Sequence, residues 1–300
     1  MTEIHPSAIV HKDAELEEGV VVGPNCVVCS GVSIGAGTVL GANVVIEKNV
    51  KVGRDNRFFP NCVIGSWPQT LGLTDESQIG GLVIGDRNFV HEYVTVHPSI
   101  SSDRETRIGN DNFLMVGTHI GHDSVLEDNI VISNSVQISG HCKIETGAWV
   151  SGMVGLHQFI TLGKWSFVAG LAGLNKDIPP FMIVSGHYPP VVRGVNKRGM
   201  KRAGLNEEQQ DKIFDAYKRL YRQGGSLLEN ARALIAQASP QGAHHGACPQ
   251  LRTGKRGQAP WAPCGDARDT GGLDENVKAI VDSIINSSKH RYGRYLETFR

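Results

Sequence analysis

Residues 108–143 read IGNDNF LMVGTH IGHDSV LEDNIV ISNSVQ ISGHCK when the chain is cut every six residues, and every block opens with isoleucine or leucine. The same spacing continues through Ile144, Val150, Leu156, Leu162, Val168 and Leu174. A helix repeats near every 3.6 residues and a strand every second residue, so neither produces a strict period of six. A six-residue repeat is typical of a parallel β-helix, in which each block supplies one short strand and one corner.

Three such blocks close a triangular coil of 18 residues, so residues with that spacing lie above one another, about 4.8 Å apart. His122, Gly140 and Gln158 are spaced in this way. We therefore expect them to share one corner on three successive coils. A histidine, a glycine and a glutamine in one column indicate a functional site.

The N-terminal part follows the same rule, because every sixth residue from Ile4 to Ile64 is apolar. The fifth position of these blocks is mostly small or β-branched, and Cys26, Cys62 and Cys142 occupy it. The fourth position is rich in glycine, asparagine and aspartate. We expect the first and fifth positions to point into the coil. The fourth should adopt left-handed backbone angles at the corners.

The repeat is interrupted twice. The first interruption, at 66–81, carries Gln69 and Thr70, and the second covers 99–107. Interruptions of a solenoid are where its loops leave the coil. Both loops precede the His122 corner, so they either decorate one edge or wall a cleft beside that corner.

After Leu174 the repeat ends at the two prolines 179 and 180. We expect an all-β solenoid with a smaller α part: a left-handed parallel β-helix over 1–180 and a C-terminal helical domain over 181–300. Apolar periodicity and capping signals predict helices over 206–222, 226–238 and 274–287. Residues 239–272 contain almost no aliphatic side chains, so a disordered insertion is expected there.

Composition adds constraints on partners and location. The 30 basic and 30 acidic residues cancel, so the chain has no net positive charge that would attract nucleic acid. No signal peptide or apolar membrane-spanning run is present, so we expect a cytoplasmic protein. Cys26 and Cys29 have a zinc-like spacing, but no second pair accompanies them, and no metal site is predicted there.

Five runs of the sequence, taken in order, carry a resemblance to a known family: Thr118–Asp123, Ser139–His141, Gly152–Phe159, Asp177–Pro180 and Gly194–Asn196. Over roughly residues 4–238 the chain resembles the UDP-N-acetylglucosamine acyltransferases that start lipid A synthesis. The resemblance implies a homotrimer with active sites between subunits. It also implies transfer of an (R)-3-hydroxyacyl chain from the phosphopantetheine of acyl carrier protein to the 3-position of UDP-N-acetylglucosamine, without any other cofactor.

This reaction assigns roles to three residues. An alcohol that attacks a thioester needs a nearby base, and His122 is the candidate because imidazole titrates near working pH. Asp123 either orients that ring or is an ordinary corner residue. The backbone N–H of Gly140 suits the negative charge that develops on the thioester oxygen, since no side chain blocks close approach, and the resemblance implies the same role.

The resemblance also places substrate contacts. Positions that match contacts to the sugar nucleotide or the acyl donor are Gln69, His119, His141 and Gln158. His119 is equally compatible with a solvated strand histidine. Asn196 and Arg202 match positions at the nucleotide end. A guanidinium on phosphate is a natural use of Arg202.

Gly170 matches the position that limits acyl-chain length. A glycine there leaves room for a longer chain than a bulky residue would. Phe167 lies close in sequence and could close the same slot.

The chain departs from the family pattern at several positions. Thr70 stands where an acidic contact to the sugar is usual, so the acceptor is either the 3-hydroxyl or a 3-amino group in its place. Arg198 and Ala203 replace an acidic residue and a second arginine near the nucleotide contacts, and Pro98 replaces an arginine in the second loop.

Two alternative functions stay open. One is another hexapeptide acyltransferase, such as the later N-acyltransferase of the same pathway, although that family has an extra N-terminal domain and this repeat starts at Ile4. The other is a γ-class carbonic anhydrase with zinc on His119, His122 and His141. The basic segment Arg193–Arg202 suits acidic acyl carrier protein, or is an ordinary solvated surface.

Overall fold

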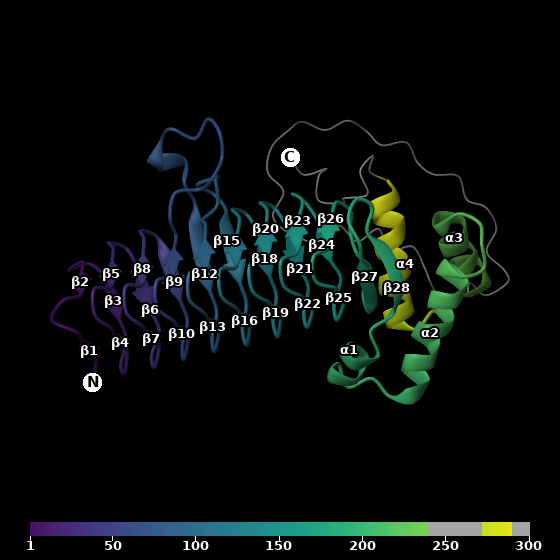
Figure 1. Cartoon of the computed structure of the whole chain (residues 1–300), viewed down its shortest axis with the longest axis horizontal. Coiled ribbons are helices and arrows are strands. Elements are labelled where there is room, and N and C mark those ends of the chain that lie inside the picture. Colours follow the sequence, from purple (N-terminus) through teal and green to yellow (C-terminus); the bar gives the residue numbers. More distant parts are fainter. Residues whose placement is uncertain (239–271, 290–300) are drawn as a thin grey trace.

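The computed structural model describes residues 1–238 and 272–289. They form a long stack of coils with a group of helices at its C-terminal end (Figure 1). The expected insertion at 239–272 lies outside the described residues, apart from Gly272.

Each coil contributes one strand to each of three sheets, which we call sheets A, B and C. The strands of sheet A are β1 (Glu3–Ile4), β4 (Val21–Val22), β7 (Val39–Leu40), β10 (Arg57–Phe58), β13 (Phe89–Val90), β16 (Phe113–Leu114), β19 (Val131–Ile132), β22 (Trp149–Val150), β25 (Phe167–Val168), β27 (Met182–Ser185) and β28 (Val191–Val195).

The strands of sheet B are β2 (Ile9–Val10), β5 (Val27–Val28), β8 (Val45–Ile46), β11 (Val63–Ile64), β14 (Thr95–Val96), β17 (His119–Ile120), β20 (Gln137–Ile138), β23 (Gly155–Leu156) and β26 (Gly173–Leu174). Those of sheet C are β3 (Glu15–Leu16), β6 (Ser33–Ile34), β9 (Val50–Val52), β12 (Gly81–Ile84), β15 (Glu105–Ile108), β18 (Val125–Leu126), β21 (Lys143–Ile144) and β24 (Thr161–Leu162).

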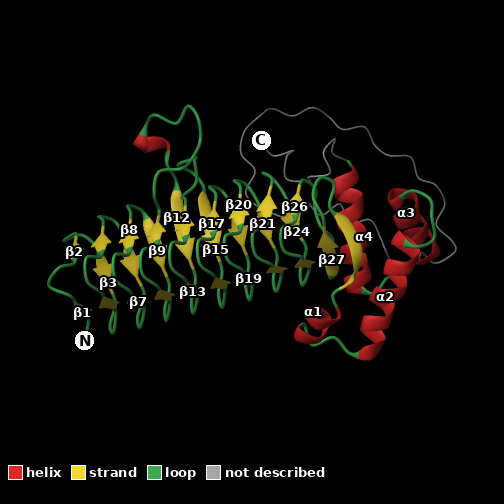
Figure 2. Cartoon of the chain, in the orientation of Figure 1, coloured by secondary structure: helices red, strands yellow, loops and turns green. Residues whose placement is uncertain are grey.

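The strands along the stack run parallel and their register confirms the coil length. His119 pairs with Gln137, and Gln137 pairs with Gly155, in steps of 18 residues. The arrangement is the expected left-handed parallel β-helix, and Figure 2 shows the short strands lined up along it. Residues with this spacing therefore form straight columns along the three sides and three corners.

The inside of the coil is apolar, as the repeat predicts. Ile120, Ile138 and Leu156 point inward from successive coils of sheet B and are at most 2% exposed. The small fifth positions are also inside, and the three cysteines expected there are buried. Corner residues at the fourth position adopt left-handed backbone angles, including Asn25 (φ 56°) and Asp123 (φ 59°). These expectations from the sequence are confirmed.

The two interruptions leave the coil as loops. The first runs between β11 and β12 and includes a short 3-10 helix, η1 (Glu76–Gln78); it is the long excursion seen above the stack in Figure 1. The second loop ends sooner than the expected 99–107, because β15 already begins at Glu105. Residues 105–107 pair with β12 of the previous coil. The repeat calls for an aliphatic residue at position 102, but Ser102 lies in this loop, and the inserted residues lengthen the coil, so that Thr95 pairs with His119, 24 residues further on.

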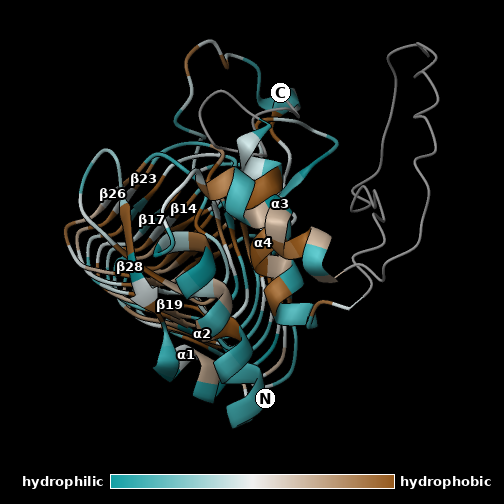
Figure 3. Cartoon of the chain, turned by 90° about the vertical axis from the view of Figure 1, so that its right-hand side faces the viewer, coloured by the Kyte–Doolittle hydropathy of each residue, from teal (hydrophilic) through white to brown (hydrophobic). Residues whose placement is uncertain are grey.

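The prolines at 179 and 180 end the regular coils but do not end sheet A. Strand β27 pairs parallel with β25, and β28 returns antiparallel to it. The helices follow: α1 (Lys197–Arg202), α2 (Glu207–Tyr221), α3 (Leu227–Ala238) and α4 (Glu275–Ser288). Seen along the stack, the helices stand in front of the last coils (Figure 3).

The helical part begins and packs as the sequence signals predict. Asn206 and Gln209 form a capping box at the start of α2, and Ser226 and Glu229 exchange the same bonds before α3. Helix α2 packs against β28, α3 and α4. The Ser287 hydroxyl at the end of α4 donates to Asp177 at 2.7 Å, which ties this helix to the last coil. Within 1–238 and 272–289, no helix has the length and apolar character needed to cross a bilayer.

Candidate functional site

His122 and Asp123 form a buried pair at the corner between sheets B and C. The Nδ1 atom of His122 lies 2.7 Å from Oδ2 of Asp123, and the two side chains are 7% and 6% exposed. Burial raises the pKa of Asp123, but hydrogen bonds from His122 and Ser99 outweigh it, so the pKa is lowered overall. Asp123 is therefore an ionised acceptor at neutral pH.

An ionised carboxylate decides the tautomer of the neighbouring ring. Asp123 can only accept a hydrogen bond, so Nδ1 of His122 carries the proton and donates it. The Nε2 atom then keeps its lone pair. His122 is thus arranged as a general base whose ring is oriented by a carboxylate.

Gly140 lies directly against this base. A Cβ atom added to Gly140 would stand 2.6 Å from Cε1 and 2.7 Å from Nε2 of His122, so only glycine fits. Among the described residues, the N–H of Gly140 has no hydrogen-bond acceptor. The same is true of the N–H groups of His122 and Gln158, at the same place on the neighbouring coils. Gly140 is distinguished by its contact with the free nitrogen of His122.

The corner column continues onto the next coils, as expected from the spacing. The N–H of His141 donates to the carbonyl of His122 at 2.9 Å, and that of Phe159 donates to the carbonyl of Gly140 at 3.3 Å. His141 stacks on Phe159 and meets the His122 ring edge-on, with centroids 4.6 and 4.9 Å apart. The structure therefore brings His122, Asp123, Gly140 and His141 together, with Gln158 at the same corner one coil further.

A histidine that the sequence interpretation missed lies beside this column. His97 is 5% exposed, and its Nδ1 lies 3.0 Å from the carbonyl oxygen of Ser66 and 2.9 Å from that of Trp67. Its ring centroid is 5.1 Å from that of His119. The sequence signal was a histidine placed directly before an interruption of the repeat.

His119 is neutral in this surrounding. Its Nδ1 lies 2.9 Å from the hydroxyl of Thr95, so it is not the fully solvated strand histidine that the sequence also allowed. Burial, with a further contribution from the neighbouring His97 and His122, lowers the pKa of His119 to about 4. A neutral imidazole at this place can donate or accept a hydrogen bond without adding charge.

Both loops are attached to the histidine cluster at their bases. His97 holds the start of the first loop through Ser66 and Trp67. In the second loop, Ser99 and Ile100 donate to the carboxylate of Asp123. Gln69 is exposed on the first loop, just beyond the part that His97 binds. Each loop is thus hydrogen-bonded to residues beside the column, and neither only decorates the edge of the coil.

Asn196 and Arg202 lie at another corner. Asn196 caps α1: its Oδ1 accepts from Gly199 at 3.0 Å and its Nδ2 donates to the carbonyl of Trp165 at 2.8 Å. The guanidinium of Arg202 lies over the rings of Trp149 and Trp165, 5.5 and 5.4 Å from their centroids. Trp165 marks the corner between sheets C and A, so within one chain these residues do not lie beside His122.

Gly170 and Phe167 belong to the remaining side of the prism. Gly170 is exposed at the corner between sheets A and B. A Cβ there would meet the carbonyl oxygen of Gly152 at 3.4 Å, an ordinary contact. Phe167 lies on β25 of sheet A, beside Trp149. The predicted site residues therefore occupy three different corners of one chain.

Metal chemistry was one alternative for the histidines. Within the part of the chain that the structure describes, the residues whose ligand atoms lie within 4.8 Å of one another are His122, Asp123 and His141, which differs from the expected set of His119, His122 and His141. His119 is directed to Thr95 instead. The carboxylate of Asp123 also accepts hydrogen bonds from His122, Ser99 and Ile100, an arrangement suited to orienting a base.

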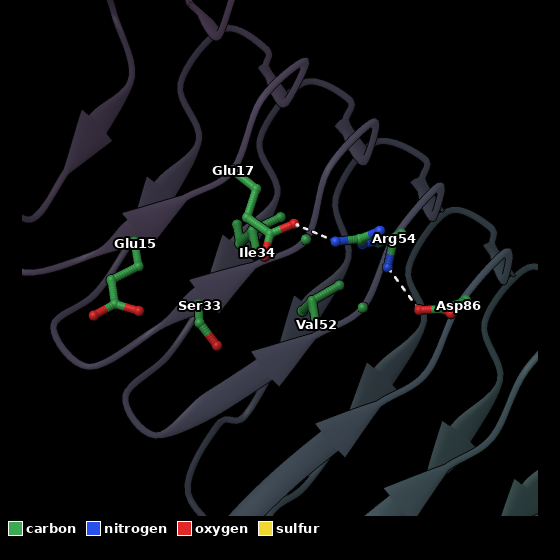
Figure 4. A pocket seen from close by; sticks show the side chains of 9 residues that line it. Glu15, Glu17, Ser33, Ile34, Val52, Arg54 and Asp86 are labelled. Carbon is green, nitrogen blue, oxygen red and sulfur yellow. Dashed lines mark hydrogen bonds and ion pairs between the residues drawn. The ribbon is translucent and has the colours of Figure 1, made fainter.

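A separate hollow lies on sheet C, several coils before the histidine cluster (Figure 4). Arg54 sits in it, with its guanidinium 3.6 Å from Glu17 and its backbone N–H donating to Asp86 at 2.8 Å. Glu15 and Ser33 line the same surface. Three carboxylates and one guanidinium line it, and it contains none of the predicted site residues.

Comparison with known proteins agrees with this geometry. Residues 177–291 match the family described as UDP-N-acetylglucosamine O-acyltransferase, domain 2. An acyl carrier protein-dependent UDP-N-acetylglucosamine O-acyltransferase of Paraburkholderia phymatum is 38% identical over 290 residues, which covers 96% of this chain and 98% of that protein. The corresponding protein of a Janthinobacterium strain is 43% identical over 248 residues, covering 82% and 94% of the two chains.

A solved structure shows the same architecture. The UDP-N-acetylglucosamine acyltransferase of Francisella novicida superposes with a TM-score of 0.79 at 30% identity, over 97% of this chain and 92% of that one. The six-residue repeat, the His122 corner and these likenesses lead to one assignment. This chain belongs to the UDP-N-acetylglucosamine O-acyltransferase family.

Proposed function

We propose that this protein transfers an (R)-3-hydroxyacyl chain from acyl carrier protein to the 3-position of UDP-N-acetylglucosamine, the first step of lipid A biosynthesis. The observation that carries the proposal is the His122–Asp123 pair, which leaves Nε2 of His122 as a free base next to Gly140. Family membership supports the substrate class, and the geometry supports the chemical role.

The reaction begins with removal of a proton from the sugar. Nε2 of His122 takes the 3-hydroxyl proton while the oxygen attacks the thioester carbonyl carbon. The ring becomes an imidazolium, and the carboxylate of Asp123 at 2.7 Å stabilises that positive charge. When the tetrahedral intermediate collapses, the C–S bond breaks. The departing phosphopantetheine thiolate takes the proton from Nε2, which restores the base.

The tetrahedral intermediate carries its negative charge on the former carbonyl oxygen. The N–H of Gly140 is a fixed backbone donor beside His122, and fixed donors stabilise such a charge without reorganising. His141 and Gln158 line the same column, and in this proposal their side chains contact the acyl donor and the sugar. His119 and Gln69 complete the substrate contacts in this proposal.

We further propose that the working unit is a homotrimer with shared sites. The base lies at one corner of the prism, whereas Asn196 and Arg202 lie at a second corner and Gly170 at a third. A substrate that contacts all of them must lie between protomers. In this arrangement Arg202, held over two tryptophan rings, binds the nucleotide phosphates of a substrate whose sugar lies at His122 of a neighbouring protomer.

The reaction needs no cofactor beyond the phosphopantetheine of acyl carrier protein. We place it in the cytoplasm, where acyl carrier protein and nucleotide sugars are made. Five basic residues on β28 and α1 offer positive charge to the acidic carrier. They are Arg193, Lys197, Arg198, Lys201 and Arg202.

An acyl-transfer assay tests the proposal. The purified protein is offered UDP-N-acetylglucosamine or its 3-amino analogue, together with a series of 3-hydroxyacyl carrier proteins, with and without a zinc chelator. Transfer to the 3-hydroxyl that survives chelation is the expected result. Preference for the 3-amino analogue would indicate that Thr70, which stands where an acidic residue is usual, determines which acceptor the enzyme uses. Absence of transfer to both would contradict the proposed function.

A further inference from the structure

The second loop places a serine against the carboxylate that orients the base. Ser99 is fully buried, and its hydroxyl lies 2.5 Å from Oδ1 of Asp123. The hydroxyl has one hydrogen, and its other acceptor is the carbonyl of Ser101 at 3.2 Å. The shorter contact to a charged oxygen takes that hydrogen, while the N–H of Ser101 donates to Ser99 at 3.0 Å.

Two backbone contacts complete the surroundings of Asp123. The N–H of Ile100 donates to Oδ2 at 3.3 Å, the oxygen that also accepts from His122. The N–H of Asp123 itself donates to the hydroxyl of Thr106 at 2.7 Å. Both carboxylate oxygens and the backbone are thus fixed, so the carboxylate cannot rotate away from His122 without losing a bond to Ser99.

The loop that carries Ser99 is itself held in place. The N–H of Gly80 donates to the carbonyl of Ser99 at 2.9 Å, and the N–H of Ser99 donates to the carbonyl of Gly81 at 3.3 Å. These two bonds involve the backbone only and remain when the Ser99 side chain is replaced, although the N–H of Ser101 then loses its acceptor.

We propose that Ser99 is a positioning residue for acyl transfer, which acts through Asp123 to hold the ring of His122 in its reactive orientation. This inference rests on the proposed function and extends it to a loop residue outside the matched runs. Ser99 touches no reacting atom. The carboxylate has a second possible partner, since Nε2 of His141 lies 3.9 Å from Oδ2 of Asp123. The bond from the Ser99 hydroxyl keeps the carboxylate on His122.

The electrostatic surroundings define what the loss of Ser99 changes. Three histidines, His97, His119 and His141, face His122 and Asp123, and the exposed carboxylate of Asp103 also acts on Asp123. When the Ser99 bond is removed, the carboxylate of Asp123 can turn toward Nε2 of His141, and its hydrogen bond to Nδ1 of His122 weakens.

A double-mutant cycle tests the proposal. We expect Ser99→Ala to lower kcat by roughly 3- to 30-fold with little change in KM, since the substrate contacts remain. Because Ser99 acts through Asp123, the Ser99→Ala/Asp123→Ala double variant should turn over no more slowly than Asp123→Ala alone. Ser101→Ala is the matched control: it removes a hydroxyl from the same loop that bonds only Asp103, and it should retain wild-type kcat.

The Nδ1–H proton of His122, which is hydrogen-bonded to Asp123, provides a second readout that does not depend on turnover. Proton NMR of protein labelled with 15N-histidine gives the position of this signal in each protein, and His122 is assigned from the signal that is missing in a His122→Gln variant. An upfield shift of the signal in Ser99→Ala but not in Ser101→Ala supports the proposal. An unshifted signal, or losses in kcat that multiply in the double variant, would overturn it. An inactive wild-type protein with the expected shift of this signal would contradict the proposed function and leave the Ser99 contact standing.

Discussion

Nδ1 of His122 lies 2.7 Å from Oδ2 of Asp123 within a corner of the coil where both side chains are almost fully buried. The pair leaves one ring nitrogen free, and Gly140 lies against that nitrogen. Removal of the base should therefore remove the proton transfer while leaving the coil, whose interior is filled by other residues, intact.

We expect His122→Ala to lower turnover by roughly 10² to 10⁴-fold, the usual contribution of a general base. Steady-state acyl transfer measures the loss, and circular dichroism and sedimentation check the fold and assembly. His11→Ala is a matched control, since His11 also lies beside an aspartate, 3.5 Å from Asp13, but on an exposed coil near the N-terminus. Wild-type turnover in His122→Ala would remove the mechanism.

Gly140→Ala should damage both packing and activity. The added methyl would stand 2.6 Å from Cε1 of His122, so the ring has to move, at a cost of roughly 1–3 kcal/mol in unfolding free energy. We expect at least about a tenfold loss of kcat from the displaced base. Gly155→Ala is the control, because a Cβ there meets no atom within 4 Å. Equal activities of the two variants would contradict the assigned contact.

A larger residue at position 170 should shorten the preferred acyl chain. The space around Gly170 accepts a side chain, since the nearest atom to an added Cβ is 3.4 Å away. We expect Gly170→Met to change the ratio of kcat/KM for long over short 3-hydroxyacyl donors by roughly 10- to 200-fold, the range for lost apolar contacts. Competition between donors of different length gives this ratio. An unchanged ratio would exclude Gly170 from the acyl-chain site.

Acid stability should depend on His119. Its pKa is about 4 in the folded protein, below its ordinary value of 6.5, so the unfolded chain binds more protons between these values. The contribution of neutral His119 to the unfolding free energy is therefore fully present above pH 6.5, and it is lost as the pH falls toward 4. His119→Gln should reduce this decline by about 2 kcal/mol, after allowance for the partial exposure of the ring. Urea unfolding at pH 7 and 4.5 measures the difference, and exposed His11→Gln should not alter it.

Arg202→Ala should weaken nucleotide binding more than it slows the chemical step. We expect KM for the UDP-sugar to rise about tenfold or more, with a smaller change in kcat, because a charged hydrogen bond to phosphate is lost. Arg202→Lys should restore little, since a lysine cannot stack flat on Trp149 and Trp165.

If each active site is shared between two protomers, mixing two impaired variants should restore activity. If His122 and Arg202 of one site come from different protomers, co-expression of His122→Ala and Arg202→Ala chains yields mixed trimers with some fully native sites. Activity of the mixture should exceed the sum of the separate variants. Strict additivity would place both residues on one protomer.

The sequence alone determined the coil. A strict period of six leaves no other regular fold, and it predicts Ile120 and Cys142 in the interior and Asp123 at a left-handed corner, where the structure has them. It also brought His122, Gly140 and Gln158 into one column, because neighbours along the stack of a solenoid are set by a fixed spacing in the chain. Local capping signals gave the helices of the C-terminal part.

Only the tertiary structure decided what lies beside that column. Ser99 lies in an interruption of the repeat and His97 lies directly before it, where the spacing no longer predicts neighbours, and their contacts depend on how each loop folds back onto the corner. The strands β27 and β28 likewise extend sheet A beyond the prolines, since a sheet edge with unpaired N–H and C=O groups accepts further strands. Repetition fixes contacts along the coil, whereas contacts between a loop and the coil are set by packing.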